Sequence, residues 1–271
     1  RHYLTTRSRA LHRFLDSWYN AIMIVLGICA VVIVVFAITA AMSDKVREAV
    51  ISSKIYKKGF AVHMNLFSRI HNNAVRKHKE DIFEKLKSSV ESVGGGDILE
   101  IGAGTGANFE FFPEGSSIIA LEPNPHMVPY LRENADKFPH VQLKNIVPGF
   151  AENMDGIPDA SVAAVVCTMT LCSVSDVKAT LAEIKRVLKP GGYFYFLEHV
   201  ADEPETWRNS FQRRFDNQWK YLGDGCSCSR ETWTHLDNAS FSTVSYRKFD
   251  LKELTVLCYL IRPHLAGHAI K

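Results

Sequence analysis

The chain has 271 residues, of which 46% are hydrophobic and 23% are charged. This composition is typical of a folded protein and excludes a disordered or low-complexity chain, and the length suits one α/β domain with additional residues before it. The formal net charge of +3 is too small to indicate nucleic-acid binding by itself.

An apolar segment follows a basic N-terminal segment, residues 1–20. Residues 21–42 include no charged side chain. A helix rises about 1.5 Å per residue, so this stretch can cross a hydrocarbon core of roughly 30 Å. A cleaved signal peptide would have an apolar part of only about 7–15 residues. The sequence therefore predicts one uncleaved transmembrane helix over residues 21–43, although basic residues on both sides of it leave its orientation undecided.

Residues 44–93 have a helical pattern with many lysines and histidines. We expect them to form a basic juxtamembrane region. Their basic face either attracts anionic membrane lipid or is an ordinary solvated helix face. The remaining residues, 94–271, form the main domain.

The cysteines are scattered through a chain much longer than the small scaffolds that depend on disulfides. We therefore expect reduced thiols in a reducing compartment. Cys226 and Cys228 are separated by one residue and have no partner Cys/His pair elsewhere, so their spacing is not that of a zinc site and no metal is expected.

From residue 94 onwards, apolar strand-like runs alternate with helical stretches, which predicts a parallel sheet with crossover helices. Strands are expected at residues 97–101, 117–121, 141–146, 163–168 and 193–199, with weaker ones near 243–249 and 266–270. Helices are expected near residues 127–137, 177–188, 207–222 and 231–239. Gly191 and Gly192, after Lys189-Pro190, predict a turn before the fifth strand.

The most informative stretch is a strand that ends in a glycine-rich turn and opens onto a helix. The turn is Gly102-Ala103-Gly104-Thr105-Gly106, and its glycines allow a sharp bend and close approach of a ligand to the main chain. The next strand ends at Glu122, about 20 residues later, where a carboxylate can accept hydrogen bonds from both ribose hydroxyls. Together these features indicate an adenosine-containing ligand.

Two details favour S-adenosylmethionine over a dinucleotide. The dinucleotide fingerprint is G-x-G-x-x-G, whereas here the third glycine comes one residue early. Glu100, just before the turn, would repel a pyrophosphate and suits a cationic amino-acid or sulfonium group.

With these motifs and the turn at residues 188–192, the domain resembles class I S-adenosylmethionine-dependent methyltransferases. Further segments make it similar to the methyltransferase-like seven group, membrane-associated enzymes that methylate alkyl thiols. These segments include residues 104–109, 123–126, 171–174, 223–226 and 230–233. The resemblance implies an α/β Rossmann-like fold, with a seven-stranded, mostly parallel sheet, helices on both faces and an antiparallel last strand. It also implies S-adenosylmethionine as cofactor, a small thiol acceptor, and residence at the endoplasmic reticulum or lipid droplets. We expect the domain to lie in the cytosol, where the cofactor is.

The cofactor-binding residues are predicted from the same motifs. Ligands in open α/β sheets bind at the carboxyl ends of the strands. The expected set is Glu100, Gly102, Ala103, Gly104 and Gly106 for the methionine part, Glu122 with Pro123 for the ribose, Phe150, Ala151 and Glu152 for the adenine, and Thr168 and Leu171 beside the cofactor.

Two residues are candidates for activating the acceptor. A thiol with a pKa near 8.5 is only a few per cent thiolate at pH 7, so a nearby base or positive field helps. His199, at the end of the fifth strand, could take the proton or merely bond to the backbone. Asp224, between two glycines, could do so or be a turn residue.

Two other functions stay open. The acceptor could be a lipid or quinone-like oxygen, or the chain could be a non-catalytic membrane scaffold that keeps the cofactor fold. A nucleic-acid substrate is not expected, because no base-flipping motif and no basic patch occur in the catalytic half. The sequence gives no indication of the oligomeric state.

Overall fold

The computed structural model describes residues 43–254 and 256–271. The chain divides into two compact units, Arg1–Ala49 and Val50–Lys271. The predicted transmembrane helix, apart from Ser43, lies outside the described residues. Among those that are described, no helix is both long and apolar enough to cross a membrane.

Three helices occupy the region expected to be helical and basic: α2 (Asp44–Ile51), α3 (Lys54–Phe83) and α4 (Leu86–Ser92). Helix α3 begins where the side chain of Ser53 accepts a hydrogen bond from the backbone N–H of Tyr56, a typical N-cap. Helices α3 and α4 belong to the same compact unit as the sheet. Most of the predicted juxtamembrane region, from Val50 onwards, lies in this unit.

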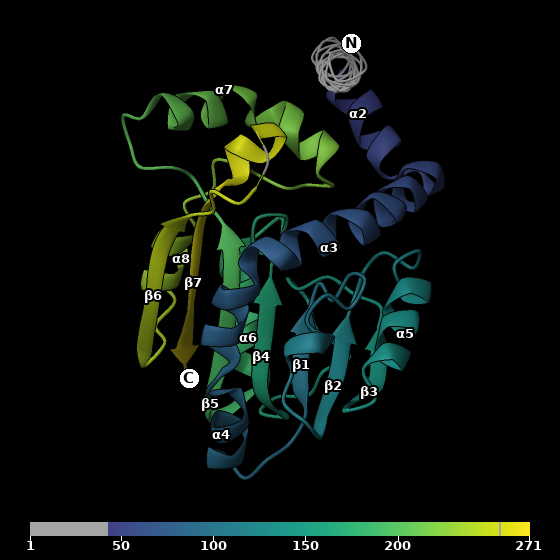
Figure 1. Cartoon of the computed structure of the whole chain (residues 1–271), viewed down its shortest axis with the longest axis vertical. Helices are drawn as coiled ribbons and strands as arrows, with labels where there is room; N and C mark the ends of the chain where they lie inside the picture. The colour runs from purple at the N-terminus through teal and green to yellow at the C-terminus, as the bar shows by residue number, and fades with distance from the viewer. Residues whose placement is uncertain (1–42, 255) are drawn as a thin grey trace, which may run out of the picture. The chain divides into compact units, whose positions relative to one another are not determined.

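A seven-stranded sheet forms the centre of this unit, in the order β3-β2-β1-β4-β5-β7-β6. The strands are β1 (Ile98–Ile101), β2 (Ser116–Leu121), β3 (Val141–Val147), β4 (Val162–Thr168), β5 (Leu188–His199), β6 (Thr243–Asp250) and β7 (Pro263–Ile270). The first five are parallel, and β7 runs antiparallel to both β5 and β6 (Figure 1). The seven expected strands and the antiparallel last strand are confirmed.

The turn predicted before the fifth strand is instead an irregularity within β5. The strand runs from Leu188 to His199, and its pairing with β4 shifts register between Leu188 and Tyr193. Gly191 has φ +72°, and a Cβ at Gly192 would lie 2.9 Å from a backbone oxygen. The residues between Leu188 and Tyr193 thus form a bulge, which needs glycines at these two positions.

The predicted helices are present as α5 (Val128–Lys137), α6 (Val177–Val187), α7 (Trp207–Leu222) and α8 (Thr232–Asp237), and η2 (Val256–Ile261) is a further short turn. The helix expected after the glycine loop is only one short 3-10 turn, η1 (Phe109–Phe111). Pro113 explains this, because a residue before proline is driven to extended geometry, and Phe112 has φ −67° and ψ 143°.

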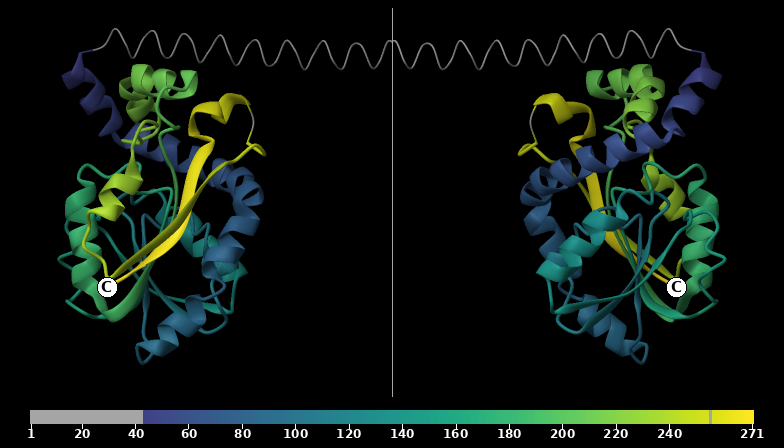
Figure 2. Two further views of the ribbon diagram at one scale, coloured as in Figure 1. Left: turned by 90° about the vertical axis from the view of Figure 1, so that its left-hand side faces the viewer. Right: turned by 90° about the vertical axis from the view of Figure 1, so that its right-hand side faces the viewer.

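The domain has three layers, with the sheet in the middle. Alternate side chains of one strand point to opposite faces. Ile98 packs with Phe83 and Leu86, on the face that α3 and α4 cover, whereas Leu99 packs with Leu181 and Ile184 of α6. Figure 2 shows these helices on opposite sides of the sheet.

Candidate active site

A cavity of about 310 Å³ lies at the carboxyl ends of β1, β2 and β4, the edge where open α/β sheets bind ligands. Helix α3 runs across these strand ends (Figure 1). The strand loops and α3 therefore provide two walls of one cavity. Of the predicted site residues, the cavity lining includes Glu100, Gly102, Ala103, Gly104, Glu122, Pro123, Phe150, Ala151, Glu152, Thr168 and Asp224.

The glycine loop is held in a left-handed conformation against β2. Gly102 and Gly104 have φ values of +61° and +55°, and the backbone N–H groups of Gly102 and Ala103 both donate to the carbonyl of Leu121. A Cβ at Gly102 would lie 2.3 Å from Oγ1 of Thr170, whereas one at Gly104 would meet nothing closer than 3.7 Å. Gly102 is thus required by packing as well as by conformation.

Glu122 joins the glycine loop to the loop after β2. Its Oε2 accepts a hydrogen bond of 2.8 Å from the N–H of Gly104, and its Oε1 accepts one of 2.8 Å from Asn124. Burial raises the pKa of this carboxyl group. Each oxygen keeps further accepting capacity, which fits a ligand with a pair of hydroxyls.

Glu100 has one carboxylate oxygen without a partner. Its side chain is buried, and Oε1 accepts a 2.7 Å hydrogen bond from the side-chain amide of Asn108. Oε2 has no hydrogen-bond partner in the part of the chain that the structure describes. Burial raises the pKa of Glu100 to about 7. An unpartnered buried carboxylate oxygen is costly, and a cationic amino group bound here would satisfy it.

Lys79, from α3, is buried, and its positive charge acts on Glu100. Its Nζ donates to Oδ1 of Asn72 at 2.7 Å and, at 3.4 Å, to the carbonyl of Ala107. Burial lowers the pKa of Lys79 to about 7, while the charge of Glu100 opposes this shift. The two groups therefore titrate in the same pH range.

The stretch expected to hold adenine lies at the mouth of the cavity. Phe150 is 66% exposed yet lines the cavity, which leaves its ring available for an apolar contact. The carboxylate of Glu152 accepts a 2.7 Å hydrogen bond from Oγ of Ser175. That carboxylate therefore ties together the loops after β3 and β4.

Two predicted cofactor residues do not reach the cavity lining. Leu171 is fully buried in the core, whereas Thr168 at the end of β4 and Met169, Thr170 and Ser173 after it line the cavity. Gly106 is also absent from the lining, and a Cβ there would lie 2.8 Å from the ring of Phe109. A left-handed backbone with φ +78° and the close packing of Phe109 both favour a glycine at residue 106.

Asp224 lines the cavity, but its carboxylate is already paired. Oδ1 lies 2.6 Å from Nζ of Lys57, and the backbone N–H of Asp224 donates to the hydroxyl of Tyr56. Burial and the nearby Asp224 raise the pKa of Tyr56 to about 12. Asp224 thus links the start of α3 to the loop between α7 and α8, at a backbone φ of +52°.

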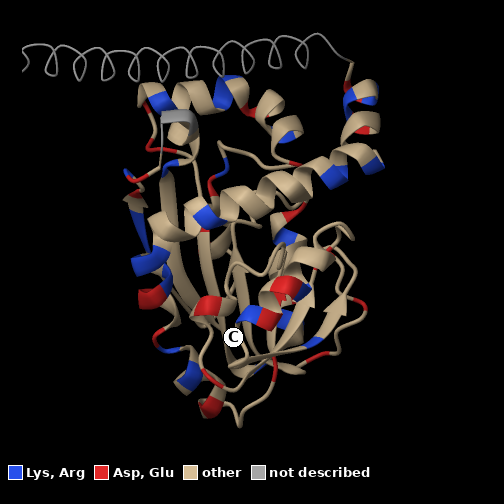
Figure 3. Cartoon of the chain, turned by 45° about the vertical axis from the view of Figure 1, so that its right-hand side comes forward, with Lys and Arg blue, Asp and Glu red and all other residues tan. Residues whose placement is uncertain are grey.

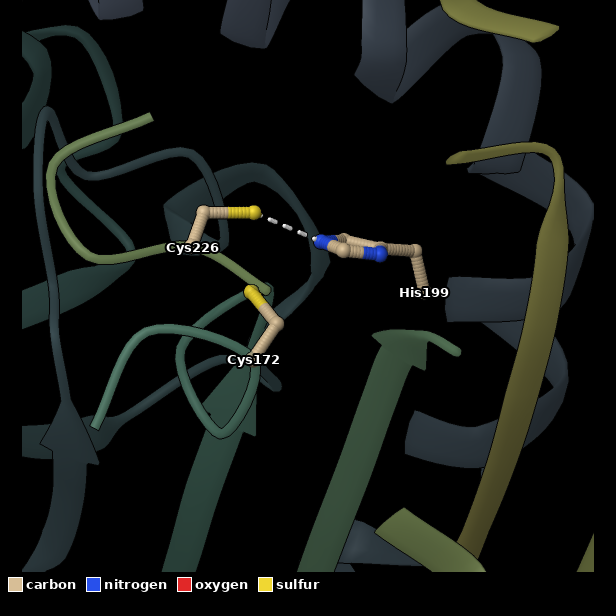
Figure 4. Close-up of side chains that lie close together, drawn as sticks. All are labelled: Cys172, His199 and Cys226. Atoms are coloured by element: carbon tan, nitrogen blue, oxygen red, sulfur yellow. Dashed lines mark hydrogen bonds between the residues drawn. The ribbon is translucent and has the colours of Figure 1, made fainter. Parts of the chain in front are cut away.

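His199 is not among the residues that line the cavity. Its buried ring lies beside two cysteines, with Nε2 3.0 Å from Sγ of Cys226 and Cys172 close by (Figure 4). Nδ1 has no hydrogen-bond partner among residues 43–254 and 256–271. The alternative in which His199 merely bonds to the backbone is not what the structure contains.

The sequence did not identify the wall that α3 contributes. Phe60, Met64, Phe67 and His71 line the cavity at helical spacing i, i+4, i+7 and i+11. This periodicity is visible in the sequence, but it indicates only a buried helix face. Which part of the fold the face covers depends on tertiary packing.

His71 and His264 form a buried pair with Nε2 atoms 3.2 Å apart. Nδ1 of His264 lies 2.9 Å from the carbonyl of Arg262, which can only accept, so we assign the proton of His264 to Nδ1. His71 must then donate through Nε2 and keep the lone pair on Nδ1. Burial lowers the pKa of His71 well below its ordinary value, so its ring is neutral.

The chain is similar to known proteins in both sequence and fold. A family profile described as a methyltransferase domain matches residues 99–196. Thiol S-methyltransferase TMT1A of Homo sapiens is 39% identical over 219 residues, which cover 81% of this chain and 88% of that protein. Thiol S-methyltransferase TMT1B of Homo sapiens is 37% identical, with 79% and 87% covered. The crystal structure of the CurJ carbon methyltransferase shares the fold at a TM-score of 0.51 and 16% identity, covering 71% of this chain and 53% of that one.

Proposed function

Because the chain belongs to the family of the TMT1A and TMT1B thiol S-methyltransferases, which are class I enzymes dependent on S-adenosylmethionine, we propose that its acceptors are small lipophilic thiols at a membrane. The relatives' names support a thiol acceptor. The apolar side chains that α3 contributes to the cavity support a lipophilic acceptor.

The observation that carries the proposal is the contrast between two walls of one cavity. The strand loops offer carboxylates and backbone groups that fit S-adenosylmethionine, including the unpartnered oxygen of Glu100. Helix α3 offers the apolar side chains of Phe60, Met64 and Phe67. An apolar acceptor bound against α3 would thus face the methyl donor.

The chain's own residues have few chemical tasks in this reaction. S-adenosylmethionine supplies the activated methyl group, and transfer needs mainly a nucleophile held close to it in a dry pocket. Glu100 holds the amino group, Glu122 the ribose, and α3 excludes water. The free lone pair on Nδ1 of His71 can accept a hydrogen bond from the acceptor thiol, whereas Asp224 is paired with Lys57.

The decisive experiment compares a small alkyl thiol with the matched alcohol and phenol, using the purified protein and S-adenosylmethionine. We expect methylation of the thiol and little of either oxygen acceptor. A preference for oxygen would replace the thiol by the lipid or quinone-like alternative. Cofactor binding without transfer to any acceptor would favour the scaffold.

The apolar wall predicts a selective effect of the Phe67→Ala variant. Removing a ring that contacts the acceptor costs about 1–2 kcal/mol of apolar contact, so KM for a lipophilic thiol should rise roughly 5- to 30-fold. The neighbouring Leu66, 64% exposed and outside the cavity lining, provides the control, Leu66→Ala. In steady-state kinetics, the KM for a hydrophilic thiol should change little in both variants. If Phe67→Ala and the wild type have equal KM values for the lipophilic thiol, the acceptor does not bind against Phe67.

Titration of Glu100 predicts that the affinity for S-adenosylmethionine depends on pH. Its raised pKa, about 7, means that the carboxyl group is neutral below this pH and charged above it. Lys79 loses its positive charge over the same range, which favours a cationic ligand in the same direction. Affinity should therefore rise by about tenfold between about pH 5.5 and about pH 7, where the ligand's amino group stays protonated.

Isothermal titration calorimetry would measure this dependence without the acceptor, whose own thiol also titrates. The Glu100→Gln variant should bind more weakly and lose most of the pH dependence. Wild-type affinity that stays constant across this range would show that Glu100 does not bind the amino group.

Membrane residence rests on two features of the sequence and one of the described residues. Residues 21–42 are uncharged and apolar, and basic residues follow them, as Figure 3 illustrates for α2 and the start of α3. Ile55, Val62, Leu66 and Ile70 are exposed apolar side chains at helical spacing on α3. We expect the full chain to stay with membranes after alkaline carbonate extraction, and a chain lacking residues 1–43 to be released.

A further inference from the structure

Three segments that are distant in the sequence bring two thiols and one imidazole together. Cys172 lies in the loop after β4, His199 is the last residue of β5, and Cys226 lies in the loop between α7 and α8 (Figure 4). One sulfur or nitrogen atom from each lies within 4.8 Å of the others. Cys172 and His199 are buried, and Cys226 is partly so.

The protein holds these three groups on a rigid framework. Glu198, next to His199, accepts hydrogen bonds from the backbone N–H groups of Thr170, Leu171 and Cys172. The second loop is tied to the first, because the N–H of Ser227 donates to the carbonyl of Cys172 at 2.8 Å. Arg230 also donates to the carbonyls of Leu171 and Val174.

The close approach of the two loops needs a glycine. Gly225 has φ +91°, and a Cβ there would lie 3.0 Å from the carbonyl oxygen of Ser173. The positions of Cys172 and Cys226 are therefore fixed by the fold and do not depend on a bond between them.

We propose that Cys172, His199 and Cys226 bind a thiophilic divalent cation such as Zn²⁺, with the fourth coordination position left open. Zn–S and Zn–N bonds of about 2.3 and 2.0 Å place the donors of a tetrahedral site about 3.5–3.8 Å apart, a separation that small side-chain movements reach from this cluster. Nε2 of His199 is the ligand nitrogen, and each thiol releases one proton on binding.

The surroundings suit a metal thiolate. Two thiolates neutralise a divalent cation, so the occupied cluster carries no net charge in a buried place. The indole N–H of Trp219 donates to Sγ of Cys226 at 3.3 Å, and it would remain a hydrogen-bond partner of a metal-bound sulfur. Three protein ligands and an open position are the arrangement of catalytic zinc sites, and Ser173 and Asp224, which flank the cysteines, line the methyl-transfer cavity.

The one-residue spacing of Cys226 and Cys228 does not predict a zinc site. Cys228 points elsewhere, with its thiol 3.5 Å from the carbonyl of Gln212. The ligands come from three separate segments, which no local spacing could reveal.

Cobalt titration of the purified full chain tests this site directly, after treatment with a chelator and a phosphine reductant. We expect one Co²⁺ per chain, with strong thiolate-to-cobalt charge-transfer absorption that Zn²⁺ abolishes by displacing the cobalt. Cys172→Ser and Cys226→Ser should each weaken binding by at least about tenfold and reduce the absorption to about half. Cys228→Ser, from the same loop as Cys226, is the matched control and should bind cobalt as the wild type does.

Binding of S-adenosylmethionine and the thermal unfolding midpoint establish whether each variant is folded. If the wild type shows no charge-transfer band, or if the cysteine variants keep it unchanged, the proposal is overturned. Because the readout is metal binding, this result is independent of which acceptor the enzyme methylates.

Discussion

The Glu122→Ala variant is expected to bind S-adenosylmethionine roughly 30- to 1,000-fold more weakly than the wild type. The carboxylate of Glu122 accepts hydrogen bonds from two backbone N–H groups, of Gly104 and Asn124. The expected range corresponds to about 2–4 kcal/mol, since about 1.4 kcal/mol is a tenfold change in affinity, and this is the contribution of one to two hydrogen bonds to a charged group, at about 1.5–3 kcal/mol each. The substitution therefore loosens the glycine loop and removes the proposed ribose contact together.

Calorimetric titration with S-adenosylmethionine would measure the change. Glu110→Ala is a suitable control, because this carboxylate lies in the 3-10 turn, is partly exposed and pairs with Arg76. A Glu122→Ala variant that binds within about threefold of the wild type would contradict the assigned role of Glu122 in the cofactor site.

The Gly102→Ala variant should be much less stable than Gly104→Ala, although both residues have left-handed backbones in the same loop. The left-handed conformation alone costs about 1–2 kcal/mol for alanine. At Gly102 the new methyl group also meets Thr170 at 2.3–2.9 Å, and such overpacking adds about 1–3 kcal/mol. At Gly104 the nearest atom is 3.7 Å away, so only the conformational cost applies.

In a domain of this size about 1 kcal/mol shifts Tm by roughly 2–4 °C, so Gly102→Ala should lower Tm by about 4–20 °C and Gly104→Ala by about 2–8 °C. Thermal unfolding without ligand is the appropriate measurement, because both substitutions also lie in the cavity wall. Adding Thr170→Ala to Gly102→Ala should restore part of the loss, since it removes the two closest atoms. Equal stabilities of the two single variants would contradict this account.

The site residues at the ends of β1, β2 and β4 could be predicted, because their positions follow from the strand pattern of the sequence. Glycines after a strand and an acid after the next strand are brought together whenever the strands are parallel neighbours, as β1 and β2 are. Glu122 and Gly104 are accordingly in hydrogen-bond contact. Thr168 lies on the cavity wall for the same reason, because it ends β4.

Residues in irregular loops could not be placed in this way. Beyond the end of β4 the chain has no regular period, so the sequence does not indicate which of Met169, Thr170 and Leu171 faces the cavity. His199 ends β5, yet its ring lies beside Cys226, which belongs to a loop between two helices. The contact between His199 and Cys226 depends on tertiary structure and cannot be predicted from local sequence.

The contribution of α3 was missed for another reason. Its position next to an apolar N-terminal segment suggested a membrane function, and its basic residues supported that interpretation. Amphipathic spacing determines that one face of a helix is buried, but not which partner buries it. The Lys57–Asp224 ion pair and the His71–His264 contact join residues that are far apart in the sequence.

The hydrogen bonds of Glu198 connect two parts of the molecule. One carboxylate holds both Thr170, beside the cofactor cavity, and Cys172, beside His199. If a ligand bound at one end shifts this loop, the free energy of binding at the other end is expected to change as well. Thermodynamic linkage requires the two effects to be equal, so a cation that tightens the cofactor site by some factor would itself be bound more tightly, by the same factor, when the cofactor is present.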